Sequence, residues 1–217
     1  MSNLEPSTNH SRIDVPGFPG IDLAVLTADE VVAAFDVVGE VADERGSMAN
    51  NPPEVEQQIA LNRAMERTLE RLPEHDANFG REVYTALAES ADHINRGLAG
   101  SWVGNLTRVD HDYGVMLWDR LVRDEKSSVR YEAYAGGLRA GVAAIADMSR
   151  EVAEEKLSAI GLTLLDGIDL FRAFEYARQG HNLHALGDRA RREQHAPEVG
   201  RAALRKLLVN LTSLEDS

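Results

Sequence analysis

The stretch Leu117–Ala143 constrains the fold of this chain more than any other, because it predicts two helices joined by a tight acidic turn. Asp124 lies in the turn, and the second helix opens at Val129 behind serines that can cap it. A helix pair of this kind cannot bury its apolar face alone, so we expect similar helices stacked beside it. The first helix carries an apolar stripe made by Leu117, Trp118, Leu121 and Val122.

This pattern resembles a HEAT repeat, whose second helix typically opens with an acid in the turn followed by valine and arginine. The likeness covers roughly residues 104–140 and includes Asp110 ahead of the first helix. In such a unit the turn aspartate accepts hydrogen bonds from backbone amides and pairs with arginines of adjacent repeats, while the valine locks the second helix onto the first. Gly137 stands where the family expects leucine, which implies an over-rotated repeat or a bend at Gly136 and Gly137.

Start signals for helices also occur in the first third of the chain. Thr27-Ala28-Asp29-Glu30 is a capping box, in which the threonine oxygen and the glutamate carboxylate each accept from a backbone amide of the other residue. Asn51-Pro52-Pro53-Glu54 places proline and an acid in a first helical turn, where both are favoured. We therefore expect one helix after each of these signals.

Glycines give the expected end points of the helices that follow. A helix from about Phe79 is predicted to end near Gly97 and Gly100, and Ser101 is predicted to cap the next one. Further helices are predicted at residues 101–108, 112–123, 127–146, 149–160, 163–178, 183–194 and 197–209.

The sequence thus predicts an all-α fold of stacked antiparallel helix pairs, arranged as a HEAT-like solenoid or an irregular helical bundle. Residues 1–20 are polar and turn-rich and are expected to form a flexible lead-in, and residues 21–217 a single helical domain. The N-terminus lacks a secretory pattern and no apolar run is long enough to span a membrane, so we expect a cytoplasmic protein.

The charge of the chain limits its partners. The formal net charge is −13, which repels nucleic acid over most of the surface and favours a protein partner with a basic surface. Nucleic-acid binding is expected only at a C-terminal basic stretch. That stretch, where basic residues outnumber acids, comprises Arg189, Arg191, Arg192, Arg201, Arg205 and Lys206. As an alternative, an acidic surface that mimics DNA would bind no nucleic acid itself but would compete with DNA for a basic partner.

Catalytic motifs are sparse. The absence of cysteine excludes thiolate chemistry, and no phosphate-binding glycine loop is present, so no cofactor is expected. One constellation resembles the HD phosphohydrolase superfamily, in which a histidine, a histidine-aspartate pair and a distant aspartate bind metal and activate water. That resemblance implies a metal site made of His75, His111, Asp112 and Asp169.

The leading hypothesis is a non-catalytic interaction module that binds another protein or assembly subunit, with self-association as one form of such binding. The HD-like metal-dependent phosphohydrolase is the first alternative, and a nucleic-acid-associated protein or DNA mimic the second. The predicted contact set surrounds the central turn and comprises Asp110, Asp112, Asp119, Asp124 and Arg130.

Overall fold

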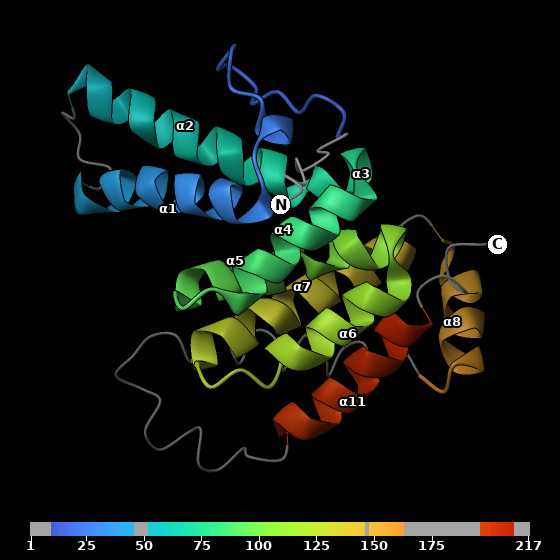
Figure 1. Cartoon of the computed structure of the whole chain (residues 1–217). Helices are drawn as coiled ribbons and strands as arrows, with labels where there is room; N and C mark the ends of the chain where they lie inside the picture. Colours follow the sequence, from blue (N-terminus) through green and yellow to red (C-terminus); the bar gives the residue numbers. More distant parts are fainter. Residues whose placement is uncertain (1–9, 46–51, 146–147, 163–195, 211–217) are drawn as a thin grey trace, which may run out of the picture. The chain divides into compact units, whose positions relative to one another are not determined.

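The chain folds as an all-α protein, which confirms the predicted class (Figure 1). The computed structural model describes residues 10–45, 52–145, 148–162 and 196–210. Within these ranges there is no strand, and the extended chain forms only an isolated bridge between Asp14 and Asp22. No helix in the described part of the chain combines the length and the apolar character needed to cross a membrane. The chain divides into two compact units, which we call unit 1 (Met1–Leu87) and unit 2 (Ala88–Ser217).

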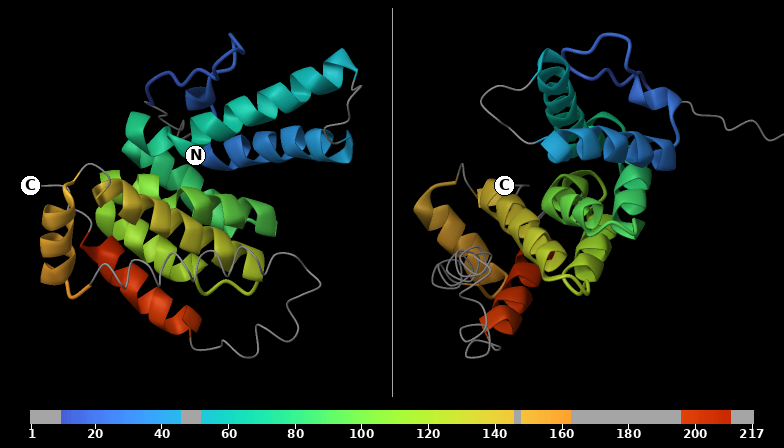
Figure 2. Two further views of the ribbon diagram at one scale, coloured as in Figure 1. Left: turned by 180° about the vertical axis from the view of Figure 1, so that it is seen from behind. Right: turned by 90° about the vertical axis from the view of Figure 1, so that its left-hand side faces the viewer.

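Helices α1 (Ala28–Arg45) and α2 (Pro53–Glu70) pack against each other in unit 1, and α3 (Leu72–His75) and α4 (Ala77–Glu89) follow (Figures 1 and 2). The predicted capping box is confirmed. The Glu30 carboxylate accepts from the Thr27 amide at 2.8 Å, and the Thr27 hydroxyl accepts from the Glu30 amide at 3.3 Å. The predicted first-turn proline is confirmed at the start of α2.

The Asp22 carboxylate fixes the backbone ahead of α1 through hydrogen bonds. Asp22 Oδ1 accepts from the amides of Ile13 at 2.9 Å and Ala24 at 3.0 Å, and it caps the short 3-10 helix η1 (Leu23–Val25). The backbone hydrogen bond from Ile13, followed by that from Ala24, holds the pKa of Asp22 below its usual range despite some desolvation. Ile13 and Val15 are buried, so residues 10–26 pack on unit 1. The predicted domain boundary at residue 20 stays a prediction.

His10 ties the same segment to the start of α4. Its ring stacks on Phe79 at a centroid distance of 4.3 Å, and its Nδ1 lies 2.9 Å from Asp76 Oδ2. Asp76 also accepts from the Phe79 amide at 2.9 Å and so caps α4. One aspartate therefore joins a distant segment to a helix start.

Unit 2 contains α5 (His93–Val109), α6 (His111–Leu121) and α7 (Ser127–Ile145). It also contains α8 (Arg150–Ala159) and α11 (Ala196–Val209), close to two of the predicted helices. The helices predicted at residues 163–178 and 183–194 lie outside the described residues.

The predicted helix break at Gly97 and Gly100 is wrong, and so is the predicted cap at Ser101. Helix α5 runs through all three positions. It starts instead at His93 and is capped by Asp92, whose carboxylate accepts from the Ile94 amide at 2.9 Å. In the sequence these glycines indicate the end of a helix, whereas in the structure Gly100 has a packing role in the middle of α5.

That role is a close contact between the backbones of α5 and α7, the most extensive helix contact in unit 2 among the described residues. A Cβ atom added to Gly100 would lie 2.8 Å from the Ala133 amide nitrogen. A Cβ added to Gly136 would lie 2.7 Å from the Ser101 carbonyl oxygen and nearer still to that of Gly100. Only glycine lets the two helices approach this closely.

Helix α7 is covered on a second side by α11. A Cβ added to Gly141 would collide with the Leu207 side chain, and Leu204 and Leu208 of α11 are buried. The Trp118 indole of α6 donates to the Ala133 carbonyl at 2.8 Å and is fully buried. Helix α7 runs without a break through Gly136 and Gly137, and its main partner is α5 rather than α6.

We predict opposite effects for alanine at two glycines of this region. Gly136→Ala should lower the free energy of unfolding by about 1–3 kcal/mol, because its methyl group pushes α7 away from the α5 backbone. Gly97→Ala is the matched control, since its Cβ would meet only Glu132 Cγ at an ordinary 3.6 Å. It should raise stability by up to about 1 kcal/mol through helix propensity. Urea denaturation followed by circular dichroism measures both, and an unchanged midpoint for Gly136→Ala would refute the close contact.

Candidate functional site

A partly buried ion pair holds the turn between α6 and α7. Arg96 of α5 donates through Nε to Asp124 Oδ2 at 2.8 Å and through Nη2 to Asp124 Oδ1 at 3.3 Å, a two-point geometry that fixes both side chains. Its other nitrogen donates to the carbonyls of Ser90 at 3.0 Å and Ala91 at 2.9 Å. Each of the paired side chains is only 12% exposed. Arg96 therefore connects the turn before α7 to the loop before α5.

The turn also satisfies its own backbone. Asp124 Oδ1 accepts from the Lys126 amide at 2.8 Å, and Arg130 donates to the carbonyls of Asp124 at 2.7 Å and Glu125 at 2.9 Å. Desolvation raises the pKa of Asp124, but hydrogen bonds from Arg96 and Lys126 outweigh it and leave the pKa below its usual range. Val129 is fully buried at the start of α7. The amide contact of Asp124 and the burial of Val129 agree with the prediction for this turn, while the HEAT-like repeat itself stays a prediction.

The remaining predicted contact residues lie on α6. Asp110 caps the helix by accepting from the Tyr113 amide at 3.4 Å. Asp119 accepts from Arg205 Nε of α11 at 3.0 and 3.2 Å. Asp112 is fully exposed. Of the five predicted residues, four are thus engaged in contacts within unit 2, namely Asp110, Asp119, Asp124 and Arg130. Asp112 faces solvent, and its Oδ1 lies 3.3 Å from His111 Nδ1.

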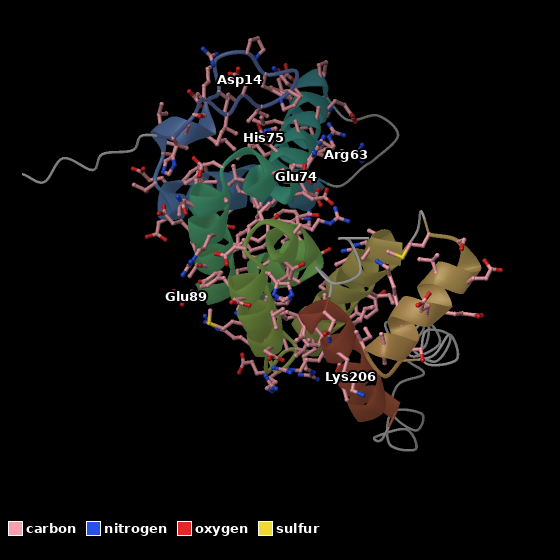
Figure 3. All side chains as sticks on the ribbon, turned by 90° about the vertical axis from the view of Figure 1, so that its right-hand side faces the viewer. Asp14, Arg63, Glu74, His75, Glu89 and Lys206 are labelled. Carbon is pink, nitrogen blue, oxygen red and sulfur yellow. The ribbon has the colours of Figure 1, made fainter. Side chains whose placement is uncertain are left out.

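The predicted basic stretch is described only in part. Arg189, Arg191 and Arg192 lie outside the described residues, and Arg201 is placed on α11 by its backbone alone. Arg205 forms the ion pair with Asp119, while Lys206 is exposed (Figure 3). Arg205 therefore helps to hold α11 against α6.

The predicted metal ligands are distributed over both units. His111 donates from Nε2 to the Leu208 carbonyl at 2.9 Å, which occupies the nitrogen that most often binds metal. His75 is exposed on α3 of unit 1. Asp169 lies outside the described residues, so the metal site stays a prediction. Among the residues that the structure describes, no group of three or more histidines, cysteines or acids could hold a metal ion.

Sequence reasoning missed an open hollow of about 390 Å³ in unit 1. The chain ahead of η1 forms one wall and the end of α2 with α3 forms the other. Arginines at every fourth position, Arg63, Arg67 and Arg71, are the sequence signal that could have indicated it, because they share one face of a helix in an acidic chain. The charged and polar residues lining it are Arg12, Asp14, Arg67, Thr68, Glu70, Arg71 and His75.

The chain matches no protein-family model, no curated protein and no solved structure. Any assignment of function therefore rests on the charges, exposures and contacts described above.

We predict that Asp124→Ala lowers the free energy of unfolding by about 1.5–3 kcal/mol, because it leaves the Arg96 guanidinium desolvated without its partner. Glu125→Ala removes the neighbouring carboxylate, which is 77% exposed and 3.9 Å from Arg96. That control should change stability by less than about 1 kcal/mol. Equal effects of the two substitutions in urea denaturation would refute a structural role for the Arg96–Asp124 pair.

The same pair predicts a pH dependence. The pKa of Asp124 in the folded protein is below its ordinary value of 3.8, so the ionised carboxylate stabilises the fold above that pH. This stabilisation is lost as the pH falls through the lower folded pKa. We expect the difference in unfolding free energy between wild type and Asp124→Ala to shrink across this acid range. A difference that stays constant would contradict this assignment, and urea midpoints in a pH series measure it.

Proposed function

We propose that this chain is a non-catalytic helical module that binds a protein partner with a basic surface. Unit 2 would present the outer face of α6 to that partner, and HEAT-like stacking of helix pairs is part of the proposal. The partner is sought in the cytoplasm, the compartment that the sequence predicts. Self-association through the same face is a further form of the proposal.

One observation carries this proposal, namely an exposed apolar side chain beside an exposed acid on α6. Met116 is 54% exposed although it lies in the middle of a helix whose other apolar residues are buried. Asp112 lies one turn earlier on the same face and is fully exposed. An apolar side chain with a carboxylate one turn before it suits a partner that offers an apolar recess with a lysine or arginine at one edge.

The polar groups of unit 2 support a binding role over a catalytic one. Arg96 and Asp124 are joined to each other, and His111 donates to a main-chain carbonyl. Arg205 is neutralised by Asp119, which weakens the case for nucleic acid at the end of the chain. These side chains stabilise helix packing. The exposed carboxylates of unit 2 are the groups that would attract a basic partner.

The test begins with capture of partners by the full-length chain from extracts of its source cells, at low and at high salt. A basic protein that is retained only at low salt is then purified, and its affinity is measured by titration calorimetry. Asp112→Lys should weaken binding by about tenfold or more, because it replaces an attraction by a repulsion.

Glu82→Lys supplies the control, since it makes the same charge change on the exposed surface of α4. It should leave the affinity within about twofold of wild type. Equal loss in both variants would show that only the total charge matters. An Asp112→Lys affinity equal to that of wild type, or binding insensitive to salt, would overturn the proposal. If DNA competed with this chain for the same partner, the result would instead favour the DNA-mimic alternative.

A further inference from the structure

We propose that the hollow in unit 1 binds the phosphate group of a small phosphorylated molecule. This site is separate from the partner surface proposed on α6. The hollow is bordered by Arg12 from the chain ahead of η1 and by Arg67 and Arg71 from the end of α2. His75 also lines the hollow. Segments far apart in the sequence therefore bring their guanidinium groups to one place.

The arginines retain hydrogen-bond donors for a ligand. Arg67 forms no hydrogen bond or ion pair with any residue in the described part of the chain, so all five of its N–H donors are available. Arg71 donates through Nε to Glu74 at 3.2 Å, which leaves its terminal nitrogens. Arg12 is engaged with Asp14 at 2.8 Å through Nε and Nη2, which leaves Nη1.

The charges of the lining favour an anion and disfavour a metal cation. Three arginines face two acids, Asp14 and Glu70, in a chain whose net charge is −13. A divalent cation at His75 would lie among guanidinium groups and be repelled by them. A phosphate monoester carries close to two negative charges and three acceptor oxygens, which matches several guanidinium forks better than a single carboxylate does.

The rest of the lining indicates what the phosphate would be attached to. The buried residues of the lining are Ile13 and Thr68, and the Thr68 hydroxyl already donates to the Ala64 carbonyl at 2.8 Å. The carboxylates of Asp14 and Glu70 can accept from hydroxyl groups of a ligand. The volume of about 390 Å³ lies at the small end of ligand sites. A phosphorylated sugar or other polyol fits this combination of size and charge.

Titration calorimetry of the full-length chain at low ionic strength tests the site with named probes. Inorganic phosphate and ribose 5-phosphate should bind with one-to-one stoichiometry, and ribose should give no saturable heat. Arg67→Gln should weaken phosphate binding by about tenfold or more. Arg12→Gln should weaken it as well, because that side chain comes from the opposite wall.

Arg63→Gln is the matched control, since Arg63 lies one turn before Arg67 on the same face of α2 but outside the hollow (Figure 3). It should leave the affinity within about twofold of wild type. Thermal melts followed by circular dichroism should coincide for wild type and the variants, because these arginines are exposed. Absence of saturable binding by both phosphates would overturn the proposal. So would equal weakening by Arg63→Gln and Arg67→Gln, or succinate binding as tightly as phosphate.

Discussion

The packing of unit 2 depends on the direct approach of two helix backbones, α5 and α7. Side chains at Gly100 and Gly136 would collide with main-chain atoms of the facing helix, so the spacing of the pair is set by the absence of side chains. Glycine in a helix interior costs about 1 kcal/mol in propensity, and the close contact offsets this through dispersion and burial. With α7 held against α5, its opposite side can accept the leucines of α11, and Trp118 can reach the Ala133 carbonyl.

Charged side chains have different surroundings in the two units of this chain. Inside unit 2, Arg96 with Asp124 and Arg205 with Asp119 connect helices and turns, so these ions have structural partners. In unit 1, Arg67 has no ion-pair partner among the described residues, and it faces a hollow although the chain as a whole is acidic. An arginine that lacks an ion-pair partner and faces a hollow is a better guide to an anionic ligand than one that is already paired. This distinction separates the central turn, which is structural, from the arginine-lined hollow.

Local signals in the sequence predicted local structure well. The capping box at Thr27, the proline start of α2 and the acidic turn at Asp124 each involve neighbouring residues, and each was confirmed. Long-range contacts were not predictable in the same way. Gly100 indicates a helix end as long as the facing helix is unknown. No pattern in the sequence connects Arg96 with Asp124. The hollow escaped prediction because its two walls come from segments that only folding brings together.

Native-state hydrogen exchange measured by NMR tests the central claim most directly. If the backbone contact of α5 and α7 holds unit 2 together, amides around Gly100 and Gly136 should exchange only through unfolding of the whole unit. Amides of α8, whose Val152 is exposed, should exchange earlier through local opening. Exchange of the α7 amides by local opening, ahead of those in α8 and α11, would contradict this account.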